Sequence, residues 1–229
     1  MRDTSLIIVC WTFDSEIMAL TQRCINSIRQ TADVEIILID NNSAIGSEEL
    51  MRLADIYVFN KDNKGYVKGL NQGIKLASYD NIVGAAPDYT ATEGWLEACK
   101  KTFIDIPNCG IAIPHLSNDP VRGDYWEEGL LGGWFLITRE ILDKVGLLDE
   151  RFFNCCSDSD YAWRLKKAGL GCIVTGYSTI HHVGHACLKK FDKHREYWLK
   201  DSEKFMDKWR DDPEVMEGIR SDTKNIRTS

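Results

Sequence analysis

The stretch "VEIILIDNNS" (Val34–Ser43) joins an unbroken aliphatic run to a polar end. Such a run is typical of a β-strand that is buried on both faces, as in a parallel sheet. Asp40 stands where this strand should end, and open parallel sheets bind ligands outside the carboxyl ends of their strands. A carboxylate there can accept a hydrogen bond from a pyrimidine N3–H or a ribose hydroxyl, and it can equally cap an Asx turn. The residues leave both interpretations open.

Three further apolar runs have the same character. They are "SLIIVCW" (5–11), "IYVF" (56–59) and "NIVGA" (81–85), and each predicts a strand. The first half of the chain therefore contains four expected strands, counting the run that ends at Asp40.

The segments between these strands have helical patterns. Residues 15–31 repeat apolar side chains at helical spacing, and Ser15 is the expected N-cap. Shorter helices are expected at 46–54, with Ser47 as the cap, and at 65–78. Strands that alternate with helices predict an α/β domain with a Rossmann-like, mostly parallel central sheet and helices on both faces.

The second half of the chain has a less regular pattern. Strand-like segments occur at 109–114, 129–138 and 172–182, and helices are expected at 139–146 and 157–169. No internal repeat and no clear linker separates it from the first half, so we expect a single domain.

The C-terminal part is expected to extend this domain. A helix there should dock through an apolar stripe of Phe191, Trp198, Phe205 and Trp209. The polar sequence after Pro213 predicts a loose tail. The expected organisation is a domain over 1–188 with two halves at about 1–90 and 91–188, a docking helix over 189–212 and a tail over 213–229.

The composition excludes several classes of protein. A formal net charge of −7 gives no electrostatic footprint for nucleic acid. No apolar run is long enough for a transmembrane segment, and the N-terminal one is too short for a secretory signal. The eight cysteines form no C-x-x-C pair and mostly lie in apolar segments, which predicts reduced core thiols. We therefore expect a soluble cytoplasmic protein, of open oligomeric state.

The segment "NKDNKGYVKGLNQG" (60–73) is a candidate for phosphate contact. It holds three glycines but neither a dinucleotide fingerprint nor a P-loop. Glycine at a helix start lets a ligand approach the backbone, and Lys64 or Lys68 could meet a phosphate. Helix packing is the simpler explanation of the glycines.

Two further segments carry possible metal ligands. The loop "GAAPDYT" (84–90) offers one carboxylate, Asp88, in what is by itself ordinary Pro-Asp turn chemistry. The segment "IHHVGHA" (180–186) contains His181, His182 and His185. A neutral imidazole suits an ion such as Mn²⁺, although this spacing is not that of a zinc site.

Two acids stand in the first turn of the helix expected at 157–169. Asp158 and Asp160 complement the helix dipole there, and Ser157 or Asp158 can act as the cap. Alternatively, one acid points into a cleft as a general base. Aromatic neighbours such as Phe153 would then raise its pKa by desolvation.

The order of these segments resembles that of the family 2 glycosyltransferases of the GT-A fold. The resemblance covers about residues 5–188, is most specific over 146–169, and is closest to the rhamnosyltransferase-like branch. It implies an inverting enzyme that moves a hexosyl or deoxyhexosyl group from a nucleotide-diphosphate sugar, with a UDP- or dTDP-sugar favoured. It also implies a glycan or other hydroxyl acceptor and a divalent metal cofactor, Mn²⁺ or Mg²⁺. In this resemblance the nucleotide-binding half is about 1–90 and the acceptor half about 91–188.

The resemblance also implies roles for residues of this sequence. The residues that it places at the nucleotide and the donor are Thr12, Asp40, Asn63, Gly65 and Asp88. The metal ligands that it implies are Asp88 and His181, with His182 as the alternative register. The residues that it places at the sugar and the acceptor are Gly133, Trp134 and Asp160. Finally, it implies that Asp158 is the general base.

The sequence departs from the family pattern at two positions. The first acid of the D-x-D element is Ala86, and the residue before the expected base is Ser157 rather than an acid. These departures motivate an alternative hypothesis, a non-catalytic module that binds a sugar nucleotide or a glycan. A nucleotidyltransferase would need a glycine-rich basic loop after the first strand and a dehydrogenase a glycine fingerprint, and the sequence has neither.

Overall fold

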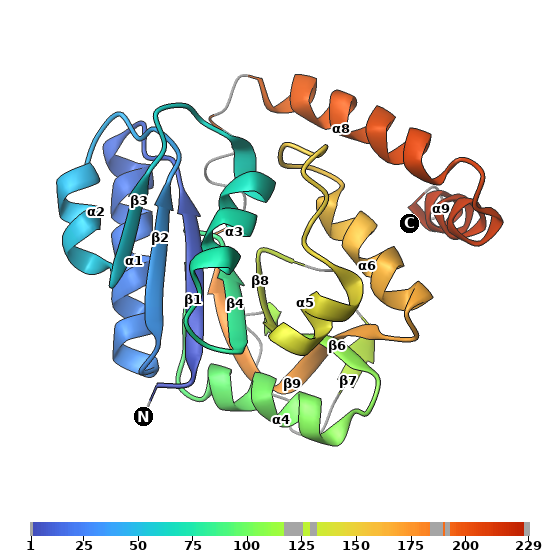
Figure 1. Ribbon diagram of the computed structural model, residues 1–229, viewed down its shortest axis with the longest axis horizontal. Helices are drawn as coiled ribbons and strands as arrows, with labels where there is room; N and C mark the ends of the chain where they lie inside the picture. The colour runs from blue at the N-terminus through green and yellow to red at the C-terminus, as the bar shows by residue number, and fades with distance from the viewer. Residues whose placement is uncertain (1, 117–125, 129–131, 184–189, 191–192, 227–229) are drawn as a thin grey trace.

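One mixed β-sheet forms the centre of the protein (Figure 1). The computed structural model describes residues 2–116, 126–128, 132–183, 190 and 193–226. Within them the strands follow the order β3-β2-β1-β4-β8-β6-β9-β5, and β7 pairs with β9. The strands are β1 (Thr4–Cys10), β2 (Glu35–Asp40), β3 (Ile56–Phe59), β4 (Asn81–Ala85), β5 (Tyr89–Thr90), β6 (Cys109–Leu116), β7 (Trp126–Glu128), β8 (Trp134–Thr138) and β9 (Gly171–His182).

The sheet has two regions that differ in strand direction. β1 pairs in parallel with β2 and β4, and β2 pairs in parallel with β3, as the alternating pattern predicted. β8 then runs antiparallel to both β4 and β6. β9 is parallel to β6 and antiparallel to β5 and β7. The carboxyl ends of β1, β2 and β4 consequently lie at one edge of the sheet.

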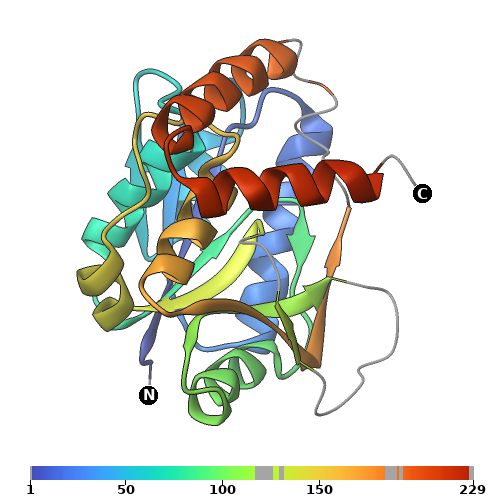
Figure 2. The ribbon, with the colours of Figure 1, turned by 90° about the vertical axis from the view of Figure 1, so that its right-hand side faces the viewer.

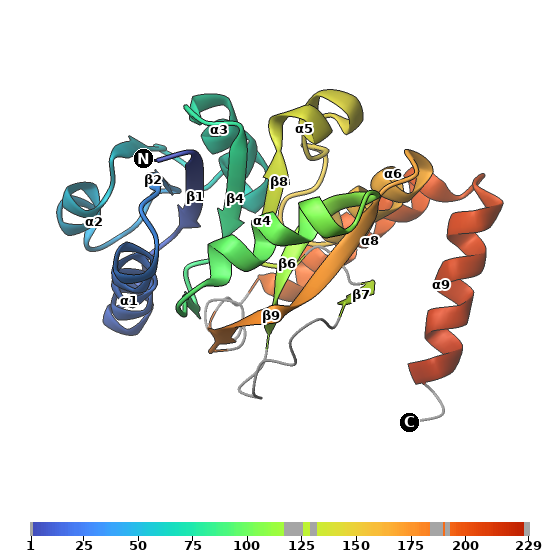
Figure 3. The same ribbon diagram turned by 90° about the horizontal axis from the view of Figure 1, so that it is seen from below.

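Helices cover both faces of this sheet (Figure 3). They are α1 (Ser15–Thr31), α2 (Ser47–Leu53), α3 (Gly65–Leu76), α4 (Trp95–Asp105), α5 (Arg139–Val145), α6 (Ser157–Lys167), α8 (His194–Trp209) and α9 (Pro213–Ile226). α1 and α4 pack on one face, and α3, α5 and α6 pack on the other. The predicted α/β class is therefore confirmed.

The central strand β1 shows why its sequence is aliphatic throughout. Leu6 and Ile8 point into the core under α1, whereas Ile7 and Val9 point into the core under α3. Alternate side chains of a strand face opposite sides of the sheet, so a strand covered on both sides needs apolar residues at every position.

Two of the predicted helix caps are wrong. The N-cap of α1 is Asp14, whose Oδ1 accepts a hydrogen bond from the backbone N–H of Ile17 at 2.9 Å, and not Ser15. α2 begins after Gly46, which has a positive φ of 83° and no side chain to cap with. The hydroxyl of Ser47 instead donates a hydrogen bond to Asp40, 7 positions earlier in the sequence. No local sequence pattern predicts this contact.

The C-terminal extension differs from the expected one. Residues 213–226 form the helix α9 rather than a loose tail, and Val215 is buried against the same core as α3. α9 follows α8 at a sharp angle on the same side of the molecule (Figure 2). Phe205 and Trp209 of α8 are buried as predicted, but Trp198 is 49% exposed. Phe191 lies outside the described residues.

Two further predictions concern the burial of the cysteines and the presence of membrane-spanning segments. Cys10, Cys24, Cys99, Cys109 and Cys172 are buried, as expected for core thiols. Cys155 and Cys156 are free and half-buried. No described helix combines the length and the hydropathy needed to cross a bilayer.

Candidate active site

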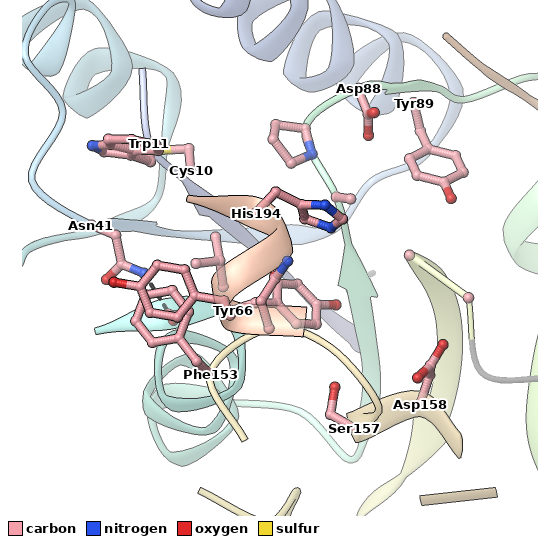
Figure 4. Close-up of a pocket in the computed structure, with 18 of the residues that line it drawn as sticks. Cys10, Trp11, Asn41, Tyr66, Asp88, Tyr89, Phe153, Ser157, Asp158 and His194 are labelled. Atoms are coloured by element: carbon pink, nitrogen blue, oxygen red, sulfur yellow. Dashed lines mark hydrogen bonds between the residues drawn. The ribbon is translucent and has the colours of Figure 1, made fainter. Parts of the chain in front are cut away.

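A cavity of about 540 Å³ lies at the carboxyl ends of β1 and β4 (Figure 4). Its wall combines the segment after β1, the start of α3, the loop after β4, the start of α6, the end of β9 and the face of α8. This is the edge at which parallel α/β sheets bind ligands. The cavity is therefore the candidate active site.

Asp40 does not reach this cavity, contrary to its expected contact with a nucleoside. Its carboxylate is fully buried and accepts hydrogen bonds from the backbone N–H of Ser43 at 2.8 Å, from Ser47 at 2.9 Å and from Tyr57 at 2.6 Å. Burial and the bond to Asp40 raise the pKa of Tyr57. Asp40 therefore holds the loop after β2, and its neighbour Asn41 lines the cavity.

Thr12 also serves the loop rather than the cavity. Its backbone N–H donates to the hydroxyl of Ser43 at 2.8 Å, and its own hydroxyl donates to the carbonyl of Ile45. The neighbouring Trp11 lines the cavity instead, with its ring 4.7 Å from that of Phe13. The sequence signal for Trp11 was a large aromatic residue directly after a buried parallel strand.

The start of α3 lines the cavity. Asn63 and Gly65 both belong to the wall, and the Asn63 side chain accepts the backbone N–H of Gly65 at 2.9 Å. Gly65 has a φ of 82°, and a Cβ there would lie 2.4 Å from the carbonyl oxygen of Phe153. Glycine is required because α3 and the segment before α6 meet at this point.

The other two glycines of α3 pack against β1, which confirms the simpler explanation of the motif. A Cβ at Gly69 would lie 2.7 Å from Val9, and one at Gly73 would lie 2.3 Å from Ile7. Lys64 and Lys68 do not line the cavity.

Asp88 and His182 form a carboxylate–imidazole pair in the cavity wall. His182 Nε2 lies 3.2 Å from Asp88 Oδ2, and the imidazole stacks on the ring of Tyr89 at 4.1 Å. The pairing of β5 with β9 sets His182 opposite Tyr89 and His181 opposite Thr90. His181 is exposed and does not line the cavity, so the structure places His182 beside Asp88. His185 lies outside the described residues.

Gly133 closes the cavity behind Ala86. Its carbonyl accepts the backbone N–H of Ala86 at 2.6 Å, and a Cβ on it would lie 2.9 Å from the Tyr89 ring. Gly133 thus lines the cavity as expected, whereas Trp134 does not. The Trp134 ring is fully buried beneath the site and packs edge-on against Trp95 at 5.0 Å.

Asp158 occupies the first turn of α6 and lines the cavity beside Ser157. Burial raises the pKa of Asp158 above the ordinary value for an aspartic acid, although its Oδ1 accepts the backbone N–H of Ser159 at 2.9 Å. A half-buried carboxyl with a raised pKa at a cavity wall has the properties of a general base.

Asp160 points away from the cavity, which contradicts its expected place at the sugar or acceptor. Its side chain is almost fully buried, and its Oδ1 lies 2.9 Å from Trp209 Nε1 and 2.6 Å from Lys208 Nζ. Two positions along a helix turn a side chain by about 200°. Asp158 and Asp160 therefore face opposite sides, and Asp160 anchors α8.

The sequence model described as glycosyl transferase family 2 matches residues 7–161, which include Asp88 and Asp158. The chain belongs to glycosyl transferase family 2. No curated protein matches the chain.

Two solved structures resemble this family 2 chain over most of its length. One is GalNAc-T7 with UDP, GalNAc and Mn²⁺, with a TM-score of 0.65, 14% identity, and coverage of 79% of this chain and 43% of that one. The other is the mannosyltransferase PcManGT from Pyrobaculum calidifontis in complex with GDP-Man and Mn²⁺. Its TM-score is 0.63 at 17% identity, and the match covers 78% of this chain and 56% of that one. The chain thus spans about half the length of these structures, and the likeness confirms the predicted GT-A fold.

The metal that such a family 2 site implies can be compared with the side chains present. Among the described residues no third His, Cys, Asp or Glu joins Asp88 and His182 in a ligand group. Carboxylate oxygen and imidazole nitrogen are ligands that suit Mn²⁺, and an octahedral ion commonly takes further ligands from substrate phosphates and water. The pair therefore fits an ion that is shared with a diphosphate.

The sequence did not reveal that α8 forms part of the family 2 cavity. His194 and Tyr197 line it, and the Tyr197 ring stacks on Phe153 at 4.2 Å. One turn later the fully buried Asp201 accepts the backbone N–H groups of residues 153, 154 and 155 at 2.9–3.0 Å. Although burial opposes ionisation, these bonds and Lys204 lower the pKa of Asp201. The only signal was the spacing of 194, 197 and 201 along one helix face.

Proposed function

We propose that the protein is an inverting glycosyltransferase of the rhamnosyltransferase-like branch. It would transfer a hexosyl or deoxyhexosyl group from a UDP- or dTDP-sugar to the hydroxyl of a glycan or other acceptor. One observation carries this proposal: the half-buried acid Asp158 of α6 lines the same cavity as the pair of Asp88, in the loop after β4, and His182, at the end of β9. Figure 4 shows Asp88 and Asp158 in the wall of this cavity. Membership of family 2 supports it.

In this proposal the donor occupies the side of the cavity built by the first half of the chain. Trp11 offers an aromatic face to the nucleobase, and Asn63 and Gly65 lie along the nucleotide. Stacking on an aromatic ring does not distinguish pyrimidines from purines. Because Asp40 is engaged within its loop, the preference for UDP or dTDP stays a prediction, which calorimetry with UDP, dTDP and GDP would test.

The diphosphate would lie beside Asp88 and His182. These two side chains would hold the divalent cation through Oδ2 and Nε2, in place of the pair with His181 that the sequence suggested. When bound, the cation supplies positive charge next to the leaving diphosphate. Ala86 contributes no ligand, so this proposal makes metal affinity dependent on the bound nucleotide.

The proton transfer is assigned to Asp158. The acceptor oxygen attacks the anomeric carbon from the face opposite the diphosphate, and Asp158 takes the proton of that hydroxyl. The bond from the anomeric carbon to the diphosphate oxygen breaks, and its electron pair stays with the leaving group. Because one displacement occurs, the anomeric configuration inverts. Burial raises the pKa of Asp158, which makes its carboxylate a stronger base.

Release of nucleotide from a panel of nucleotide sugars in the presence of Mn²⁺ tests the proposal. Wild type should turn over at least one donor, and Asp158→Asn should be slower by about 100-fold or more. Equal, slow release by both proteins with no product on any acceptor would instead support a non-catalytic module that binds sugar nucleotides.

A further inference from the structure

Tyr66 carries an unexplained polar group in the cavity. Its ring lines the wall, and its hydroxyl is buried with no hydrogen-bond partner among the described residues. Buried polar groups in folded proteins are nearly always paired, because desolvation without a partner is unfavourable. A buried hydroxyl on a ring that lines a cavity, with no partner among the described residues, therefore points to a partner that belongs to the ligand.

The backbone on both sides of Tyr66 is held in place. Gly65 adopts a φ of 82° and packs so closely on Phe153 that a Cβ would lie 2.4 Å from its carbonyl oxygen. The backbone N–H of Val67 donates to the same oxygen at 3.4 Å. The phenol is thus positioned before any ligand binds, as a recognition group requires.

The surroundings of the phenol define what it can do. Burial raises the pKa of Tyr66, and the nearby Tyr89 and Asp158 raise it further. The phenol therefore stays neutral and can donate one hydrogen bond and accept others, but it is no base. Tyr66, Tyr89 and Asp158 line the same cavity (Figure 4), and the phenol lies near both the assigned base and the neighbour of Asp88.

We propose that the Tyr66 hydroxyl hydrogen-bonds a hydroxyl group of the transferred sugar. This inference rests on the proposed function, in which the sugar ring lies between the diphosphate at Asp88 and the acceptor at Asp158. A phenol and a sugar hydroxyl are each both donor and acceptor, so either can supply what the other lacks. A donor without that hydroxyl would leave the phenol unpaired, which makes Tyr66 a specificity-determining residue.

Calorimetry on Tyr66→Phe separates the sugar from the nucleotide. The probes are the nucleotide sugar that wild type binds most tightly in a panel and its matched nucleotide diphosphate, each with Mn²⁺. We expect the variant to bind the diphosphate as wild type does and the nucleotide sugar about tenfold more weakly. Its melting temperature should not fall, because the hydroxyl that is removed has no partner among the described residues.

Tyr161→Phe is the matched control. Its hydroxyl donates to the carbonyl of Gly146 at 2.8 Å and lies outside the cavity wall. This variant should melt at a lower temperature and bind both probes normally. Wild-type affinity of Tyr66→Phe for the nucleotide sugar, or an equal loss for both probes, would overturn the inference alone. If wild type bound no nucleotide and no nucleotide sugar, the proposed function and the inference would fall together.

Discussion

Asp88 and His182 lie 94 positions apart in the sequence, yet their Oδ2 and Nε2 atoms are 3.2 Å apart. The pairing of β5 with β9 creates this contact, because it sets His182 opposite Tyr89. Alternation along β9 turns the adjacent His181 to the exposed side. Of these two neighbouring histidines, one lines the cavity and the other is exposed. A variant of each is therefore the control for a variant of the other.

His182→Ala should lose the Mn²⁺-dependent part of nucleotide binding, whereas His181→Ala should keep it. The reason is that, of the two histidines, only His182 has an imidazole nitrogen beside the Asp88 carboxylate, where both groups can bind one cation. Calorimetry with UDP and GDP, each with Mn²⁺ and with EDTA, measures this part directly. Loss of the metal dependence in His181→Ala with none in His182→Ala would reassign the ligand.

Asp158→Asn should increase stability at neutral pH while it removes activity. The folded-state pKa of Asp158 is raised, so the buried charge lowers the stability of wild type as pH rises through that pKa. The stability advantage of the variant should therefore be larger at pH 7 than at pH 4, as measured by urea unfolding. An equal difference at both pH values would contradict the raised pKa.

The raised pKa of Asp158 should also appear in the pH dependence of wild-type activity. The rate of sugar transfer should decline in acid at a pH above the usual pKa of an aspartic acid, because the base must be ionised.

Asp201→Ala should destabilise the protein by about 3 kcal/mol, because three backbone N–H groups lose a charged acceptor. The pKa of Asp201 is lowered in the folded state, so its contribution is full at neutral pH and declines as pH falls through that value. Urea unfolding at pH 7 and in acid measures both effects. Asp207→Ala on the exposed side of α8 is the control and should change stability little. Similar losses for both variants would show that Asp201 contributes no more than a surface acid.

Gly65→Ala should cost more than about 3 kcal/mol of stability, because it adds a clash with the Phe153 carbonyl to an unfavourable positive φ. Gly94→Ala isolates the second effect. Gly94 has a φ of 75° at the start of α4, and a Cβ there would meet no atom within 4 Å. Its substitution should therefore lower the free energy of unfolding by about 1 kcal/mol. Thermal unfolding compares the two, and equal losses would show that the clash is relieved by local adjustment.

The sequence predicted the parts of this structure that rest on repeated local patterns. Aliphatic runs marked β1, β2 and β4, and helical spacing marked α1, because burial on both faces of a sheet or on one face of a helix constrains every residue of the element. The place of Asp88 and Asp158 at one cavity also followed, since their order along the chain resembled that of a known family.

The failures concern side-chain direction and distant contacts. Asp40 was expected to hydrogen-bond a nucleoside, but its carboxylate accepts a hydrogen bond from the hydroxyl of Tyr57, 17 positions away. Asp160 was expected at the acceptor, but Lys208 and Trp209 of α8 hold it. A carboxylate at a strand end or in a helix turn has the same local pattern whether it faces a cavity or a partner. Only tertiary structure decides between them.

The helix α8 is fastened to both halves of the molecule. Before α8 begins, Lys190 pairs with Asp14 and Glu16 at the start of α1, and near the end of α8 Lys208 pairs with Asp149 and Asp160. The family 2 match ends at residue 161, so α8 lies outside the matched residues. We therefore expect that exchanging the segment after residue 189 between family members changes the α8 side of the cavity wall and leaves the residues of the family match unchanged.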